Sequence, residues 1–405
     1  MNKTVLNNGM TIITNKVSSK IVALEYVVQV GAFHEEGYPF GISHFLEHMM
    51  LNGTTSRSKE DIFDTIQYLG GDIDANTSFY STSYQCTIMK KFWKDGLEVV
   101  SDIVWNAAVP EGEIEKERKV IEQEIKMLSD DPINHLQEGI FANLFKDNPE
   151  KYTVIGTVDS ISGINKARLD AYRKQFYTPD RVALVVSGDI EHSEIVSFFD
   201  NYDIQPSSKY IEDLRPEAFN TLGSETYTIR SDFDQGYFSC AMIAPSRQSA
   251  DYYAFQLIIN LLSEGLSSRL YRKLREELGL LYGLGMEYLE LKDSGLGLFT
   301  AITDAKNFAE VKDNFIKELN KLKEQPLREK ELQQIKNVST YYLYSASETS
   351  SSINEIIVTD YMFAEIQDIE DTIQTISSIT ANDIMNCANK YFVESNYMFV
   401  EMIPE

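Results

Sequence analysis

The chain has 405 residues, of which 43% are hydrophobic and 24% charged, an ordinary composition for a globular protein with more than one core. Its formal net charge of −25 argues against a nucleic-acid partner, because neutralising phosphates requires clustered Lys and Arg. The three cysteines are far apart and predict no disulfide framework, and no apolar run approaches the ~18 residues that a membrane span needs.

The N-terminal sequence MNKTVLNNGMTIITN predicts a β-hairpin that turns at Asn-Asn-Gly. No secretory or transit signal is recognised in it, so a cytoplasmic location is expected. Further elements follow from hydrophobic periodicity and from glycine punctuation. We expect a strand over 21–31, helices over 42–51 and 59–70, two strands within 72–89, a helix over 113–128 and a buried strand over 181–188.

The second half of the chain repeats the first with a constant shift of 215 residues. The segment SISGINKARLDAYRKQFYTPDRVALVV (160–186) matches TISSITANDIMNCANKYFVESNYMFVE (375–401) in pattern. We therefore expect an α+β fold of two homologous domains, each with a mostly antiparallel sheet flanked by helices. The polar, proline-containing stretch between them predicts a linker. The predicted domains are 1–204 and 221–405, joined by the linker 205–220.

The segment GISHFLEHMMLNGTT carries His44 and His48, with Glu47 immediately before the second histidine. On a helix, at ~100° per residue, the two imidazoles lie on one face about one turn apart. Imidazoles at this spacing suit zinc, and the adjacent carboxylate is placed to act as a general base. The motif is HxxEH, the reverse of the commoner HExxH. The alternative is a pair of capping or core histidines that bind no metal.

A catalytic zinc site needs a third protein ligand, which is expected to be an acid on a nearby rigid element. The helix predicted over 113–128 offers Glu117 and Glu124, seven residues apart and therefore near one face. Spacing alone leaves both residues open as the third ligand. The other acids of this helix are interpreted as a solvated face; they are Glu113, Glu115 and Glu122.

Three segments carry a family resemblance: HFLEHMMLNGT, LGGDIDANTS and ERKVIEQEIKM. They resemble the inverted-motif zinc peptidases, a family that includes pitrilysin, insulin-degrading enzyme and the mitochondrial processing peptidase. The chain length resembles the bacterial processing-peptidase-like branch. The segments LNNGMTIIT, VGAFHEEG, VIGTVDSI and TPDRVALVVSGDI also match in order, so the resemblance covers nearly the whole chain.

The resemblance implies one Zn²⁺ per chain, with His44, His48 and Glu124 as its ligands. It also makes Glu47 the general base that activates a zinc-bound water. The family's third ligand lies ~76 residues after the second histidine, and this spacing singles out Glu124 in the present chain. Glu117 matches the family's acid one heptad upstream, which is expected to orient a ligand.

The segment LSSRLYRKLREELGLLYG (266–283) resembles the family's substrate-gripping segment. Its Arg and Tyr, seven residues apart, correspond to Arg275 and Tyr282. The resemblance implies that these two side chains hold the substrate backbone and stabilise the developing oxyanion. No long glycine-rich loop precedes Ser267, so the chain departs from the non-catalytic processing-peptidase subunit, which carries one.

The strand that follows the paired glycines is implied to bind substrate through Asp74, Ala75 and Asn76. The family usually has Asn-Ala where this chain has Asp74-Ala75. A carboxylate therefore replaces an amide donor, and a preference for basic side chains is expected.

These observations predict a zinc metalloendopeptidase that cleaves small unfolded peptides or leader-like segments inside a dimeric chamber. Long members of the family enclose a chamber with four domains, whereas this chain has two. The resemblance therefore implies a homodimer in which Arg275 and Tyr282 of one chain complete the zinc site of the other. One alternative is a non-catalytic peptide-binding or scaffold subunit of a processing-peptidase-like complex. A maturation protease with a narrow substrate range is a further alternative.

Overall fold

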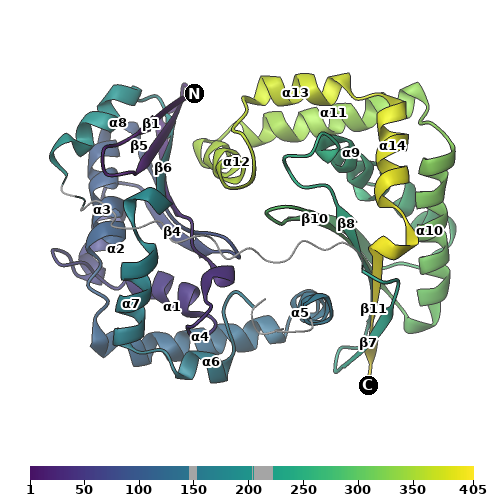
Figure 1. Ribbon diagram of the computed structural model, residues 1–405, viewed down its shortest axis with the longest axis horizontal. Coiled ribbons are helices and arrows are strands. Elements are labelled where there is room, and N and C mark those ends of the chain that lie inside the picture. Colours follow the sequence, from purple (N-terminus) through teal and green to yellow (C-terminus); the bar gives the residue numbers. More distant parts are fainter. Residues whose placement is uncertain (146–152, 203, 205–221) are drawn as a thin grey trace. The chain divides into compact units, whose positions relative to one another are not determined.

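The computed structural model describes residues 1–145, 153–202, 204 and 222–405, and these form two compact units (Figure 1). Unit 1 takes its described residues from 1–131, 145–215 and 346–362, and unit 2 takes them from 132–144, 216–345 and 363–405. The predicted linker, 205–220, lies outside the described residues. No helix in the described part of the chain is long and apolar enough to span a bilayer.

Unit 1 contains a sheet with the strand order β1-β2-β6-β3-β5-β4. Neighbouring strands in this sheet run antiparallel except for the pair β2–β6, which is parallel. The predicted N-terminal hairpin is present and turns at Gly9, whose φ of +101° favours glycine. The strands are β1 (Asn2–Val5), β2 (Thr11–Lys16), β3 (Ile21–Val28), β4 (Asp72–Thr77), β5 (Thr82–Met89) and β6 (Val182–Gly188).

The helices of unit 1 confirm those predicted from periodicity. The second one, α2, begins with a capping box between Ser58 and Asp61 and ends just before Gly70, which has a φ of +71°. The helices are α1 (Ile42–Met50), α2 (Lys59–Tyr68), α3 (Trp93–Asn106), α4 (Ile114–Ser129), α6 (Val158–Ser162), α7 (Lys166–Phe176), α8 (His192–Phe198) and α12 (Ser350–Phe363).

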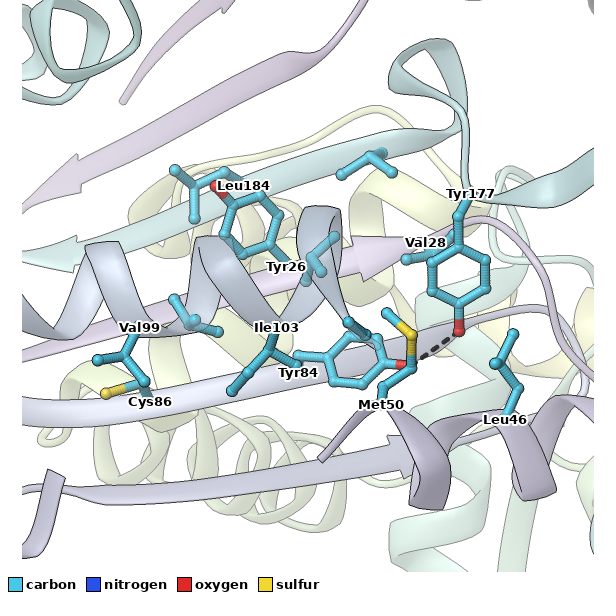
Figure 2. Close-up of a cluster of buried hydrophobic side chains, with 14 of the residues drawn as sticks. Tyr26, Val28, Leu46, Met50, Tyr84, Cys86, Val99, Ile103, Tyr177 and Leu184 are labelled. Atoms are coloured by element: carbon cyan, nitrogen blue, oxygen red, sulfur yellow. Dashed lines mark hydrogen bonds between the residues drawn. The ribbon is translucent and has the colours of Figure 1, made fainter. Parts of the chain in front are cut away.

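The core of unit 1 lies between the sheet and the helices α1 and α3 (Figure 2). Leu46 and Met50 of α1 point into it, together with Tyr26 and Tyr84 from the sheet. The Tyr84 hydroxyl is hydrogen-bonded to that of Tyr177 at 2.8 Å, so the polar ends of these buried rings are satisfied. Burial of its apolar side fixes the rotation of α1 about its axis, and this sets where its polar residues point.

Unit 2 contains a second sheet with the order β7-β11-β8-β10-β9, in which only β7 and β11 pair in parallel. The strands are β7 (Thr226–Ser231), β8 (Gly236–Ala244), β9 (Gly283–Glu290), β10 (Gly295–Thr303) and β11 (Tyr397–Pro404). The helices are α5 (Pro132–Leu144), α9 (Tyr252–Ser263), α10 (Phe308–Glu324), α11 (Glu329–Ala346), α13 (Ile369–Ser378), α14 (Ala381–Tyr391) and the π-helix η7 (Tyr271–Glu277).

The predicted repeat is visible in element boundaries. Helices α7 and α14 begin at 166 and 381 and end at 176 and 391, so both ends differ by 215; β6 and β11 begin at 182 and 397, with the same difference. The order β2-β6-β3-β5-β4 also corresponds strand by strand to β7-β11-β8-β10-β9, including the parallel pair. The two mostly antiparallel α+β sheets with flanking helices confirm the predicted fold class.

Each half of the chain contributes one helix to the other half's compact unit. Helix α5 packs in unit 2 against β7, where Gly139 leaves room for Ile229. Most of α12 belongs to unit 1, where Ser350 Oγ donates to the Ile21 carbonyl at 3.0 Å and Asn354 Nδ2 donates to the Val185 carbonyl at 3.2 Å. The sequence halves, 1–204 and 221–405, therefore differ from the compact units by these two helices.

Candidate metal centre

Helix α1 is held at its N-terminus by a buried carboxylate. Glu35 accepts hydrogen bonds from the backbone N–H groups of Gly41 at 2.7 Å and Ser43 at 2.9 Å. These donors have no partner within the helix, so Glu35 satisfies them, while burial raises the pKa of its carboxyl group to about 8. The position of α1 along its own axis is thereby fixed from outside the HxxEH motif.

We expect Glu35→Ala to lower the free energy of unfolding by about 2–4 kcal/mol, because it leaves two buried N–H donors unsatisfied. The matched control is Glu36→Ala, which removes the same side chain at the neighbouring exposed position and should change stability by less than about 0.5 kcal/mol. Urea unfolding followed by circular dichroism measures both. Equal stability of the two variants would contradict the capping role.

The residues predicted to bind metal come together between α1 and α4. The Glu124 Oε2 atom lies 3.7 Å from His44 Nε2 and 3.6 Å from His48 Nε2. Ligand atoms of these three residues all lie within 4.8 Å of one another, and they form the one such group found among the described residues. Helix spacing left Glu117 and Glu124 open as the third ligand, and of these two it is Glu124 that belongs to this group.

The three side chains fit a zinc ion. The N···O separations of 3.6 and 3.7 Å are too long for hydrogen bonds. Two ligands that each lie about 2.0–2.2 Å from a shared tetrahedral ion are about 3.4 Å apart. Two imidazoles and one carboxylate, with space for a further ligand, are also the donor set of a catalytic zinc site.

Glu117, which the family resemblance implied would orient a ligand, lies against one of the two histidines. Its Oε2 atom lies 3.2 Å from His48 Nδ1, and its Oε1 atom accepts from Lys59 Nζ at 3.3 Å. A carboxylate on Nδ1 fixes the ring and directs Nε2 towards the metal position. His44 lacks such a carboxylate, because its buried Nδ1 atom has no hydrogen-bond partner in the described part of the chain.

Glu47 is buried beside the metal position and is held by a residue that sequence reasoning did not identify. Its Oε2 atom accepts a hydrogen bond from Thr77 Oγ1 at 2.7 Å. Thr77 ends β4, thirty residues further along the chain. No periodic spacing connects a strand terminus to a helix so distant in sequence, and the only available signal was that Thr77 directly follows the predicted substrate-binding residues Asp74–Asn76.

The ionisation of the cluster follows from burial and from charge pairing. Burial lowers the pKa of His44 to about 4. Burial also acts to lower the pKa of His48, but the carboxylates of Glu117 and Glu124 outweigh it and raise this pKa to about 9. The hydrogen bond with His48 lowers the pKa of Glu117 to about 2. The pKa of Glu124 is also lowered, first by its interaction with His48. Burial raises the pKa of Glu47, the property expected of a general base.

We expect zinc binding to release about one proton at pH 7.5, because metal coordination requires a neutral imidazole. In the metal-free protein His48 is protonated below its pKa of about 9, whereas His44, with a pKa of about 4, is already neutral. The release should therefore persist from about pH 5 to 8, fall to about half a proton near pH 9 and vanish above about pH 10. Calorimetric titration in buffers of different ionisation enthalpy counts the protons. Zero release at pH 7.5 would contradict this assignment.

A cavity of about 520 Å³ opens beside the cluster. The predicted substrate-binding residues Asp74, Ala75 and Asn76 line it together with Thr77. They belong to β4, which ends the sheet order and pairs only with β5, so its other edge is not covered by a strand of this sheet. The cavity also has apolar walls, made by Leu51, Phe63, Val154 and Ile155.

Arg275 and Tyr282 belong to unit 2, whereas the metal cluster belongs to unit 1. Both side chains are exposed, Tyr282 to 57%. The Arg275 guanidinium lies over the ring of Tyr271 at 5.2 Å from its centroid, and the Tyr282 N–H donates to the Ile302 carbonyl at 2.9 Å. The backbone of Tyr282 is thus held by the sheet while its phenol is free to contact another molecule.

Comparison with known proteins gives the same family for both halves. Residues 10–158 match the model described as Insulinase (Peptidase family M16), and residues 163–339 match the Peptidase M16 inactive domain. A protein of Rickettsia felis named an uncharacterized zinc protease is 29% identical over 394 residues, covering 96% of this chain and 94% of that protein. The Bacillus subtilis zinc protease YmxG, also named as uncharacterized, is 26% identical over 392 residues, with the same coverage.

Solved structures share the fold over the whole chain. A protease from Helicobacter pylori superposes with a TM-score of 0.90 at 21% identity, covering 100% of this chain and 99% of that one. A structure from Pseudomonas fluorescens described as a peptidase M16 inactive domain superposes with a TM-score of 0.87 at 16% identity, covering 100% and 98%. The matched family models, which span most of the chain, and these relatives show that the chain belongs to the M16 peptidase family, that of insulinase and pitrilysin.

Proposed function

We propose that this protein is a zinc metalloendopeptidase, with Zn²⁺ held by His44, His48 and Glu124. The observation that carries the proposal is the convergence of these three side chains, next to a buried Glu47 that Thr77 holds in place. The zinc-protease names of its relatives support it. The expected cytoplasmic location stays a prediction.

The chain's own residues supply positioning and proton transfer. Zinc, when bound, would supply Lewis-acid polarisation of the scissile carbonyl and lower the pKa of a water molecule. Glu47 would take a proton from the attacking water and pass it to the leaving amine. The raised pKa of Glu47, caused first by burial, brings the carboxylate closer in basicity to the proton it must accept. The Thr77 hydroxyl leaves the second oxygen of Glu47 free for this transfer.

The substrate class follows from the shape and charge of the cavity. An extended peptide could add to the uncovered edge of β4, where main-chain hydrogen bonds give affinity with little sequence demand. The acidic side chains that line the cavity outnumber its one lysine, Lys59, and favour basic substrate side chains; they are Glu47, Asp74, Glu117 and Glu124. We propose small unfolded peptides or leader-like segments as substrates, processed within a dimeric chamber.

We further propose a homodimer in which Arg275 and Tyr282 of one chain complete the metal site of the other. The support is that both side chains are exposed on unit 2. Arg275 belongs to the π-helix η7, and Tyr282 immediately precedes β9. A guanidinium and a phenol are donors suited to a substrate carbonyl and its developing oxyanion.

Metal content tests the proposal directly. We expect about one zinc per chain in the purified protein, and Glu124→Gln should lose it because a protein ligand is removed. Glu117→Gln should keep the ligands but weaken zinc affinity by about 10–100-fold. The control is Glu122→Gln, the same change at a half-buried position of α4 that is not part of the metal cluster. Elemental analysis measures the zinc content of the native chain and the three variants, and hydrolysis of a quenched basic peptide, before and after chelation, measures their activity. Zinc retained in Glu124→Gln would contradict the ligand set.

The alternative function is a non-catalytic peptide-binding or scaffold subunit. One observation favours it: the second half matches a family model described as inactive. Binding of a basic peptide without hydrolysis by the zinc-loaded protein would support this alternative over the peptidase.

A further inference from the structure

Unit 2 contains a hollow of about 820 Å³ that the proposed peptidase chemistry does not use. It lies where four helix ends meet: the C-terminal ends of α9 and α10, and the N-terminal ends of η7 and α11. Two negative and two positive ends of helix dipoles border it, so the dipoles offset one another and the side chains set its charge. Its volume is in the range of small-molecule sites.

The side chains that line the hollow are more basic than the chain as a whole. Six of them are Lys or Arg and four are Glu, which leaves a surplus of two positive charges. The whole chain, in contrast, has a formal charge of −25. A basic hollow in so acidic a protein would attract anions locally while the rest of the surface repels them.

The four carboxylates of the hollow already have donors within the protein. Arg269 forms a fork with Glu331, at 2.8 and 2.7 Å. Lys321 donates to the buried Glu318 at 2.5 Å. The two remaining pairs are Lys273 with Glu277 at 2.8 Å and Tyr342 with Glu264 at 2.5 Å.

Three of the six Lys and Arg side chains that line the hollow take no part in these pairs. Arg272 from η7, Arg328 before α11 and Lys330 in its first turn are exposed, and none has an ion-pair partner among the residues that the structure describes. The hydrogen bond and charge of Arg269 lower the pKa of Glu331, and the charges of Arg328 and Arg272 lower it further. The charges of both guanidinium groups therefore act on Glu331, one of the side chains that line the hollow.

We propose that this hollow binds a small oxyanion with two or more negative charges, through Arg272, Arg328 and Lys330. Guanidinium groups bind phosphate or carboxylate oxygens in pairs, and a lysine adds a point charge. The proposal is independent of the metal site, because every residue it uses belongs to unit 2.

Calorimetric titration of the full, zinc-loaded chain tests the proposal with two probes, inorganic tripolyphosphate and citrate. Saturable binding of one anion per chain is expected, and the two probes are expected to differ in affinity. Single replacements Arg272→Gln, Arg328→Gln and Lys330→Gln should each weaken binding about threefold, and the triple variant about thirtyfold. The three side chains are exposed, so the variants should fold, and circular dichroism verifies this.

The matched control is Lys317→Gln, which removes one positive charge from an exposed position of α10 outside the hollow. It should leave the affinity unchanged. Both probes also chelate zinc, so the zinc content is measured before and after titration, and the triple variant, whose metal site is intact, corrects for chelation. Tighter binding of tripolyphosphate indicates a phosphate ligand, and tighter binding of citrate a polycarboxylate. Unsaturable binding, or equal binding by the triple variant and the native chain, would overturn the proposal.

Discussion

The Glu47→Gln variant should retain zinc at about one ion per chain and lose peptide hydrolysis by about three orders of magnitude in kcat, the contribution of a positioned general base. Glutamine keeps the volume of the side chain and can still accept from the Thr77 hydroxyl, so the cavity and the metal ligands are preserved. It cannot take a proton from water. The separation of metal binding from catalysis is the feature that identifies a base rather than a ligand.

A graded pair of substitutions at Thr77 makes this test sharper. Thr77→Ser keeps the hydroxyl and should stay near native activity, whereas Thr77→Val keeps the shape but removes the donor to Glu47. We expect Thr77→Val to lower kcat by about tenfold, the effect of losing one hydrogen bond that orients the base. Elemental analysis measures the zinc content of each variant, and initial rates with a quenched peptide measure kcat. If Glu47→Gln lost its zinc together with its activity, Glu47 would be a ligand or a structural residue.

Much of this site could be predicted from the sequence because its chemistry is local or has a fixed spacing. His44 and His48 are one helical turn apart, so their convergence follows from helix geometry alone. Glu124 is different, because helix spacing left Glu117 and Glu124 both open as the third ligand. Only the spacing found in the family favoured Glu124. The structure supplies a physical reason for that choice, since Glu124 reaches both Nε2 atoms and Glu117 reaches Nδ1 of His48.

The residues that sequence reasoning missed act through tertiary contacts. Glu35 caps α1 across a loop, and Thr77 contacts Glu47 from the end of a strand. Neither contact has a period or a motif that a single sequence could display. The exchange of α5 and α12 between the units was missed for a related reason. An internal repeat shows which elements correspond, but not which copy of the sheet each helix packs against.

The repeat itself could be predicted well because it depends on the pattern of buried positions. Two segments that share a 215-residue shift in sequence also share helix boundaries, strand starts and the pairing order of their sheets. The two halves nevertheless differ in chemistry. The candidate metal cluster lies in unit 1, and within the described residues unit 2 has no corresponding group, so the two copies of one fold carry different side chains at this place.

Because the metal cluster lies in unit 1 and Tyr282 lies in unit 2, the second prediction concerns assembly. Glu47→Gln and Tyr282→Phe should each be nearly inactive, since Tyr282→Phe removes an oxyanion donor worth about 10²–10³ in kcat. When the two variants are mixed under subunit exchange, each mixed dimer regains one complete site. That site combines Glu47 of the Tyr282→Phe chain with Tyr282 of the Glu47→Gln chain.

Random exchange of equal amounts makes half of the dimers mixed, and each has one of its two sites intact, so activity should recover to about one quarter of the native value. Size-exclusion chromatography with light scattering first establishes that the protein is a dimer, and differently tagged chains measure the extent of exchange. The control is a mixture of Glu47→Gln with Glu124→Gln, which damages the same side of the site in both chains and should stay inactive. If the first mixture exchanges fully and still does not recover, both functions belong to one chain, and Arg275 and Tyr282 of a partner are not needed to complete the metal site.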